Sequence, residues 1–440
     1  MNNKKWMGIL LGGIMAASLA APCSVSAAEK TTLTFWHAMG GTNGEVLQQI
    51  VDDFNASQDE IEIKAEYQGT YDDTITKLKA AMQSDSGLPD VCQMYDVGTK
   101  FMYDSGAVIP VEDKFESTGY DKSSVMEVIS SYYTVDGKQY AMPFNVSTPM
   151  LYYNKDVFEA AGLDPETPPT TYDEVLEDAK KIVESGAAPV GYSQAIYGWF
   201  FEQQLAGLGV TYGNNDNGRK EAVTAVDFDS NGGGLKVFDM WKKLYDSGYF
   251  EDYGTTTADT QTAFFSGQVG MIIESTAILK NAVDSSPFEV GTGYLPRIEQ
   301  NDEGGVIIGG GSLWLTDTGN EANEDAAWKF IEYITTPDVQ AKWSMGTGYF
   351  AINEKAYETE DMKAYLKENP NFETAINQLK DSPVNCNTAG VLSGVQTEAR
   401  LTFNEIMPQV YDGKLTTQDA VDQLAASVNK AIENYNESIK

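Results

Sequence analysis

From residue 31 onward, the hydrophobic positions alternate between the spacing of strands and that of helices. Residues 31–36 (TTLTFW) form a β-type run, and residues 61–67 alternate apolar and polar side chains, as a half-buried strand does. Between them, apolar residues recur at helical spacing: Val46, Leu47, Ile50, Val51 and Phe54. Residues 71–84 return to helical spacing, and 89–95 form another strand-like run. This order predicts an α/β domain with a mostly parallel sheet.

A second portion with the same alternation begins near Met142. Residues 151–153 are β-like, and a short helix over 155–161 ends at Gly162. Thr171 and Glu174 have the spacing of a capping box, which predicts a helix over 172–184. Further predicted elements are a helix at 235–245, strands at 271–273 and 306–315, and a mainly helical region from 320 to 440.

The N-terminus has the pattern of a secretory signal peptide. Lys4 and Lys5 precede an apolar stretch over 7–21, and small residues lead to Ala27 and Ala28 before the first acidic residue. We therefore expect export, with cleavage near Ala27/Ala28, to the periplasm or the outer face of the cytoplasmic membrane. Lipidation at Cys23 is the alternative, although Pro22 fits that signal poorly. Without residues 1–28, the chain remains long enough for two lobes or domains.

The charge balance limits the classes of partner. The chain has 65 acidic and 30 basic residues, a formal net charge of −35. This charge argues against nucleic acid and anionic membrane surfaces as partners. Cys92 and Cys386 are the cysteines after the predicted leader, so disulfides are not the main source of stability. A buried free thiol is expected at Cys92, with a Cys92–Cys386 bridge as the alternative.

Most catalytic and metal-site patterns are missing from the sequence. With His37 as its single histidine, the chain cannot form an HExxH or other multi-histidine metal site. It has no Cys-x-x-Cys pair, P-loop or Gly-x-Ser-x-Gly elbow. The calcium-loop-like start at Asp227 has Phe238 where a bidentate Glu is required. We therefore expect no metal, no cofactor and no enzyme activity, although paired carboxylates among 65 acids leave a glycosidase formally open.

Several motifs along the mature chain resemble the family 1 extracellular solute-binding proteins of ABC importers. The matching stretches are FWHAMGG (35–41), YQGTY (67–71), YDVGT (95–99), PFNVSTP (143–149), LYYNKD (151–156), GLDPE (162–166), IIGGGSLW (307–314) and TGY (347–349). LYYNKD is general to the family, whereas FWH, YQGTY and IIGGGSLW are similar to its glycerol-phosphate-binding branch.

The resemblance implies a two-lobed periplasmic-binding-protein fold of type II, with a ligand cleft between the lobes. It places the N-lobe at 29–143 plus 277–318 and the C-lobe at 144–276 plus 319–440, with crossings near 142–146, 273–277 and 315–325. Lobe closure on the ligand and docking of the closed form on a membrane permease are implied as well. We expect a monomer that binds a small molecule: sn-glycerol 3-phosphate, a glycerophosphodiester or, alternatively, a sugar or oligosaccharide.

The resemblance places the family's ligand contacts on seven residues of this chain: Tyr71, Asp96, Ser147, Ser275, Gly310, Tyr349 and Arg400. A guanidinium such as that of Arg400 suits phosphate, and the hydroxyl groups suit a polyol. Asp96 stands where the family usually has Glu, so its shorter side chain puts that contact in question. Each residue also has a structural alternative, such as a helix start for Tyr71 or a turn for Ser147. The resemblance also implies an additional aromatic in the cleft, at Tyr197 or Trp199 of the 196–199 stretch.

Overall fold

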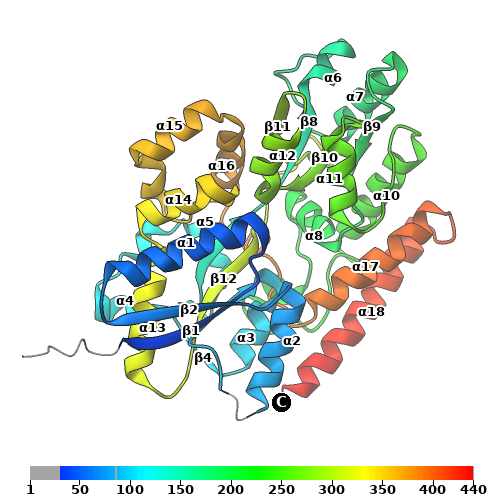
Figure 1. Ribbon diagram of the computed structural model, residues 1–440. Coiled ribbons are helices and arrows are strands. Elements are labelled where there is room, and N and C mark those ends of the chain that lie inside the picture. The colour runs from blue at the N-terminus through cyan, green and yellow to red at the C-terminus, as the bar shows by residue number, and fades with distance from the viewer. Residues whose placement is uncertain (1–29, 85–86, 440) are drawn as a thin grey trace, which may run out of the picture.

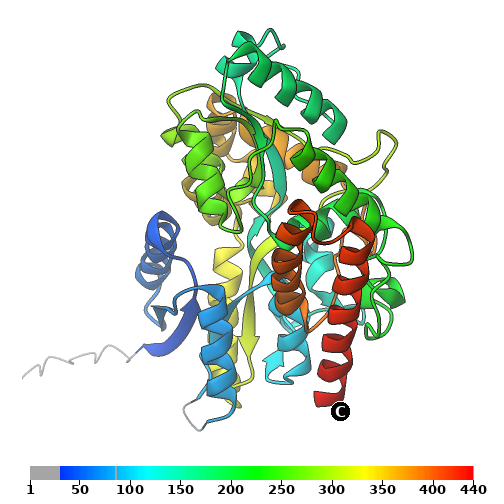
Figure 2. The same cartoon turned by 90° about the vertical axis from the view of Figure 1, so that its right-hand side faces the viewer.

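A computed structural model describes residues 30–84 and 87–439; the predicted signal peptide and Cys23 lie outside them. The chain forms two lobes, each built on its own β-sheet (Figures 1 and 2). The first sheet has the strand order β2-β1-β3-β12-β4, and β7 also pairs with β12. The second has the order β11-β8-β10-β9. None of the helices in the described ranges is long and apolar enough to cross a membrane.

The strands of the first sheet are β1 (Thr31–His37), β2 (Ile61–Tyr67), β3 (Val91–Tyr95), β4 (Val108–Ile109), β7 (Met142–Ser147) and β12 (Gly309–Thr316). Those of the second are β8 (Pro149–Asn154), β9 (Val190–Ser193), β10 (Val269–Ser275) and β11 (Val290–Gly293). A small hairpin pairs β5 (Thr134–Val135) with β6 (Lys138–Gln139). The predicted strands are thus confirmed, with ends shifted by at most three residues.

The pairing directions differ from the expected mostly parallel sheets. β1 is parallel to β2 and β3, but β12 is antiparallel to β3, β4 and β7. In the second sheet β8 is antiparallel to both neighbours, and the β9–β10 pair is parallel. Both sheets are therefore mixed. The reason is that the chain reaches β12 from the second lobe. β12 therefore starts at the end of the sheet where β1–β3 finish, and it runs in the opposite direction.

The helices of the first part are α1 (Gly41–Ser57), α2 (Tyr71–Met82), α3 (Thr99–Asp104), α4 (Glu112–Thr118) and α5 (Glu127–Ser130). Next come α6 (Lys155–Ala160), α7 (Tyr172–Ser185), α8 (Gly198–Gly207), α9 (Asn214–Gly218), α10 (Gly233–Asp246), α11 (Thr257–Phe265) and α12 (Leu279–Ser285). The C-terminal region holds α13 (Glu321–Ile334), α14 (Pro337–Thr347), α15 (Glu360–Glu368), α16 (Asn371–Asp381), α17 (Gln396–Tyr411) and α18 (Thr417–Ser438). Short 3-10 turns are η1 (Asp96–Gly98), η2 (Lys122–Ser124), η3 (Ser131–Tyr133), η4 (Thr276–Ile278) and η5 (Glu354–Glu358).

The predicted capping box starts α7. The Thr171 hydroxyl accepts from the Glu174 N–H, the Glu174 carboxylate accepts from the Thr171 N–H, and Gly186 ends the helix with φ 77°. The same box starts α2 at Thr70 and Asp73 and α18 at Thr416 and Asp419. Tyr71 is the first residue of α2.

Two of the three crossings between the lobes lie later in the chain than expected. β7 continues through Thr148 directly into β8, close to the first predicted crossing. β11 pairs with β8, so residues up to 293 stay in the second lobe, and the expected N-lobe segment 277–318 is wrong over that part. The second crossing is the connection from β11 to β12.

The third crossing also lies later than expected. α13 packs on β1 and β12, and α14 packs on α1, so both helices belong to the first lobe. α16 packs on β11, α17 packs on α8 and α10, and α18 packs on α10 in the second lobe (Figure 1). The expected C-lobe segment 319–440 is therefore wrong for α13 and α14. The buried rings of Trp328 and Trp343 explain this, because they complete the core of the first lobe.

Candidate ligand site

Five of the seven expected contacts come from the first lobe and lie at the sheet edge that faces the second. Tyr71 begins α2, Asp96 follows β3 directly, and Ser147 ends β7. Gly310 lies at the start of β12, and Tyr349 follows α14. The carboxyl ends of β1–β3 meet at this edge, which is where α/β proteins commonly bind ligands.

Ser275 and Arg400 come from the second lobe. Ser275 ends β10, and its hydroxyl accepts from the Ala277 N–H at 3.1 Å, so it caps η4. The next residue, Thr276, donates its N–H to the Thr148 carbonyl at 2.8 Å, which ties the end of β10 to the β7–β8 crossing. The Ser275 hydroxyl can still donate a hydrogen bond to a ligand.

Arg400 lies in a buried cluster with two carboxylates. Its Nη2 donates to Asp96 Oδ2 at 2.8 Å and to Glu202 Oε2 at 2.7 Å, and its Nε donates to Glu202 Oε1 at 2.8 Å. Glu202 and Arg400 belong to α8 and α17 of the second lobe, whereas Asp96 belongs to the first. The Arg400–Asp96 ion pair therefore joins the two lobes, and the shorter Asp side chain reaches the guanidinium.

Burial and charge act in opposite directions in this cluster. Burial alone would lower the pKa of Arg400, but Asp96 and Glu202 together raise it well above its ordinary value. Burial raises the pKa of Glu202, and Arg400 offsets only part of that effect. The guanidinium is therefore always charged.

Asn145 connects Tyr71 with the start of β12. Its Nδ2 donates to the Tyr71 hydroxyl at 2.6 Å, and its Oδ1 accepts from Gln93 Nε2 at 2.6 Å. Gly310 has φ +96°, and a methyl group built there would overlap the Asn145 carbonyl oxygen. Position 310 therefore requires glycine for the close approach of β7 and β12 as well as for its φ.

Stacked aromatic pairs line the first-lobe side. Tyr71 stacks on Tyr95 with ring centroids 5.2 Å apart, and the Tyr95 hydroxyl lies 2.6 Å from Thr397 Oγ1 of α17. Tyr349 is 9% exposed and stacks on Trp343 at 5.7 Å. Burial raises the pKa of both Tyr71 and Tyr349, so both hydroxyls stay neutral. The Tyr95–Thr397 contact is a second link between the lobes.

The aromatic stretch at 197–199 lies at the start of α8. Trp199 is 5% exposed, and its ring packs against the start of β12: a methyl group on Gly309 would lie 2.7 Å from it. Its buried indole N–H has no hydrogen-bond partner among the described residues. The Tyr197 ring lies 6.1 Å from that of Trp199. Burial raises the pKa of Tyr197 to about 12; Arg400 opposes this rise, and Asp96 and Glu202 add to it. Tyr197 thus lies near the charged cluster, whereas Trp199 packs against the start of β12.

Sequence reasoning missed Glu202 and Asn145 as site residues. Glu202 is an acidic residue inside the apolar run GWFFEQQLAG, and a charge in such a run is itself a signal of a buried partner. Asn145 lies inside the PFNVSTP motif, where only Ser147 was selected.

His37 and the cysteines have local roles. His37 Nδ1 accepts from the Met39 N–H at 3.3 Å, and burial lowers the pKa of His37 to about 4, so it is neutral. Cys92 and Cys386 are both free, and the alternative of a Cys92–Cys386 disulfide is therefore wrong. The described residues hold no group of three or more His, Cys, Asp or Glu side chains that could bind a metal ion.

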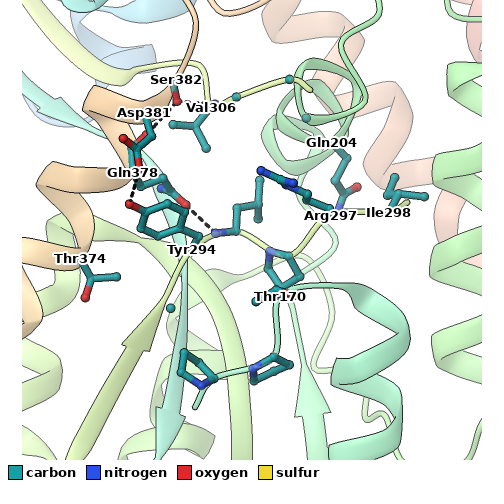
Figure 3. A pocket seen from close by; sticks show the side chains of 18 of the residues that line it. Thr170, Gln204, Tyr294, Arg297, Ile298, Val306, Thr374, Gln378, Asp381 and Ser382 are labelled. Atoms are coloured by element: carbon teal, nitrogen blue, oxygen red, sulfur yellow. Dashed lines mark hydrogen bonds between the residues drawn. The ribbon is translucent and has the colours of Figure 1, made fainter. Parts of the chain in front are cut away.

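A cavity of about 560 Å³ lies in a different place, beside the β11–β12 crossing (Figure 3). Its lining includes Arg297, Gln204 and Val306 and none of the seven expected contacts. Polar groups in its wall bond to one another: Tyr294 donates to Asp381 Oδ2 at 2.7 Å, and the Leu295 N–H donates to Gln378 Oε1 at 2.5 Å (Figure 3). These bonds anchor the crossing to α16, so the cavity wall serves the connection between the lobes.

Residues 49–374 match the model of a family described as bacterial extracellular solute-binding protein. The chain belongs to this family. It is 31% identical over 417 residues to the sn-glycerol-3-phosphate-binding periplasmic protein UgpB of Escherichia coli, a match that covers 93% of this chain and 94% of that protein.

Two solved structures show the same fold. A cyclic alpha-maltosyl-1,6-maltose binding protein from Arthrobacter globiformis is 26% identical with a TM-score of 0.76, covering 92% of this chain and 100% of that one. UgpB from Mycobacterium tuberculosis in complex with glycerophosphocholine is 20% identical with a TM-score of 0.78, covering 92% and 99%. The predicted family and the two-lobed α/β fold are thus confirmed. Members of this family capture small molecules as substrate-binding subunits of ABC importers and work with a membrane permease.

Proposed function

We propose that this protein captures sn-glycerol 3-phosphate or a glycerophosphodiester outside the cytoplasm and delivers it to its ABC permease. The observation that carries the proposal is the buried Arg400 guanidinium, which faces the first lobe from the second. A guanidinium between the lobes binds an anionic group and, at the same time, holds the lobes together around it. The 31%-identical relative is named for binding sn-glycerol 3-phosphate, which supports the same ligand class.

The other expected contacts suit the polyol end of such a ligand. Tyr71, Ser147, Ser275 and Tyr349 offer neutral hydroxyl groups, and Asp96 accepts hydrogen bonds from ligand hydroxyls. The seven residues come from both lobes, so bound ligand stabilises the closed arrangement, and the permease recognises it. The chain transports its ligand unchanged and has no catalytic role.

A sugar is the second candidate ligand, and one observation favours it. Arg400 is already paired with Asp96 and Glu202, so the cluster has no uncompensated positive charge. A neutral ligand fits such a site without further charge, and stacked tyrosines are a common surface for sugar rings. The 26%-identical structural relative is itself named for binding a cyclic maltose derivative.

The protein's location follows from the N-terminal pattern. Cleavage near Ala27/Ala28 would release the chain into the space outside the cytoplasmic membrane, whereas lipidation at Cys23 would anchor it there. Mass measurement of the exported protein distinguishes these outcomes.

A thermal-shift and calorimetric panel tests the ligand. It contains sn-glycerol 3-phosphate, glycerophosphocholine, glycerol and maltodextrins, each offered to the mature protein. A ligand at about 1,000 times its Kd should stabilise the fold by about 4 kcal/mol. We expect a shift with a glycerophosphate and its loss in Arg400→Ala, whereas Arg297→Ala, which removes an exposed guanidinium elsewhere, should respond as the unmodified protein does. A shift with a maltodextrin and none with either phosphate would contradict the proposal.

A further inference from the structure

Glu202 neutralises Arg400 from within the same lobe. Both of its carboxylate oxygens accept from the guanidinium, and Gln396 Nε2 donates to Oε1 at 3.0 Å. Glu202 is 7% exposed and lies on α8, and Arg400 lies on α17, so opening of the lobes leaves this pair intact. A ligand therefore meets Arg400 as a compensated charge, whatever the position of the first lobe.

Asp96 adds a third charge when the lobes meet. One guanidinium and two carboxylates give the buried cluster a net charge of about −1. The amino group Nη1 of Arg400 has no protein acceptor within the described ranges, so it is the donor left for a ligand. Each further negative charge brought to that group is repelled by Glu202 and Asp96 in a site where burial weakens screening.

We propose that Glu202 is a specificity-determining residue that makes the site favour a phosphate with one negative charge, as in a glycerophosphodiester, over the doubly charged phosphate of a monoester. This inference rests on the proposed function and narrows its ligand class. A monoester loses its second proton near pH 6, whereas a diester keeps a single charge at all pH values above its low first pKa. The two ligands therefore differ in charge at pH 8 and much less at pH 5.5.

The ionisable groups around the cluster keep the same charge between pH 5.5 and pH 8.0. The ionisable groups outside the cluster that interact with its charges are Tyr71, Tyr95, Tyr132, Tyr133, Tyr197 and Tyr212. Burial raises the pKa of all six tyrosines, so they stay neutral up to pH 8. Burial raises the pKa of Glu202, and protonation of Glu202 at low pH would weaken the repulsion of both ligands. The change of the Kd ratio with pH therefore reports the repulsion between the ligand's charge and the charge of the cluster.

The test is calorimetric titration of the mature protein with sn-glycerol 3-phosphate and with glycerophosphoglycerol, a diester without a cationic group, at pH 5.5 and 8.0. If the protein binds mainly the singly charged form of the monoester, the apparent Kd of the monoester rises with pH, because that form becomes scarce. We expect the monoester-to-diester Kd ratio to rise at least about tenfold between the two pH values. A ratio that stays constant, or a monoester that binds as tightly as the diester at pH 8.0, would overturn the inference.

Glu202→Gln keeps the size of the side chain and removes its charge. We expect this change to lower the monoester-to-diester ratio at pH 8.0 by about fivefold or more. Glu398→Gln removes an exposed charge from the same helix as Arg400 and should leave the ratio unchanged. Should Glu202→Gln fail to fold, the pH dependence of the unmodified protein decides alone. Binding of a maltodextrin with no binding of either phosphate at either pH would overturn both this inference and the proposed function.

Discussion

Gly310 shows how a single residue shapes the site. Its φ of +96° is strained for any residue with a side chain, and the neighbouring Asn145 carbonyl leaves no room for one. Asn145 in turn holds the Tyr71 hydroxyl at 2.6 Å. A change at position 310 therefore moves a proposed ligand contact as well as the strand.

Gly310→Ala should lower the free energy of unfolding by at least about 2 kcal/mol, because strain and overlap add. It should also weaken ligand binding through Asn145 and Tyr71. Chemical denaturation and calorimetry measure the two effects. Gly207→Ala is the matched control, since a methyl group there meets nothing within 4 Å. Equal stability of the two variants would contradict the steric argument.

His37 should make stability depend on pH. Its pKa is about 4 in the folded protein and about 6.5 when unfolded, so the folded state binds the proton less well. Its contribution is fully present above pH 6.5 and is lost as the pH falls towards 4, by roughly 2 to 3 kcal/mol. His37→Asn retains a hydrogen-bond acceptor and should remove this part of the acid sensitivity. The measurement is the difference between urea unfolding curves at pH 7 and pH 4.5; a difference unchanged by the substitution would refute it.

Asp96 and Arg400 were both expected at the ligand site from the family resemblance, and the structure brings them together. Arg400 Nη2 donates to Asp96 Oδ2 at 2.8 Å across the lobes. Glu202 was missed because its role depends on its ion pair with Arg400, which lies 198 positions further along the chain. When the two residues of a buried ion pair lie far apart in the sequence, the only local sign of the pair is a charged residue inside an apolar run.

At the scale of the elements, local sequence signals predicted where helices and strands begin and end to within a few residues. They did not predict the direction in which the strands pair. The Thr171–Glu174 box predicted the start of α7 to the residue, because both of its hydrogen bonds form within one turn. The direction of β12 relative to β3 was not predictable in the same way, because the strands are more than 200 residues apart and the crossing between them sets their orientation. The same crossing explains why 277–293 was assigned to the wrong lobe.

The capping boxes of α2 and α18 offer a matched test. Thr70→Ala and Thr416→Ala each remove a hydroxyl that accepts from the N–H three residues on, and each should cost about 1 kcal/mol of stability. α2 begins at Tyr71, so Thr70→Ala should also weaken ligand binding, whereas Thr416→Ala should not. Thermal unfolding and calorimetry of the two variants check this. Equal ligand affinity in both would show that the start of α2 does not position Tyr71.

At the scale of the whole molecule, the two lobes meet through a few specific contacts. The Arg400–Asp96 pair and the Tyr95–Thr397 hydrogen bond lie at the proposed site, and Tyr435 of α18 donates to Asp104 of α3 at 2.7 Å. Asp96 and Arg400 are proposed ligand contacts, and Tyr95 stacks on a third, Tyr71. Ligand binding and lobe closure therefore share contacts, which is the physical basis of coupling between them.

The net charge of −35 should affect the rate of capture more than its strength. An anionic ligand is repelled at long range, and that repulsion is screened as the Debye length falls from about 30 Å at 0.01 M salt to about 8 Å at 0.15 M. We expect the association rate of a glycerophosphate to increase several-fold over this range, because steering by the whole-molecule field acts on encounter. The rate for a neutral maltodextrin, if it binds, should stay constant. Stopped-flow tryptophan fluorescence measures both. A phosphate that associates more slowly as salt rises would mean that a local positive field around Arg400 outweighs the acidic surface, and the charge balance assigned to the cluster would then be wrong.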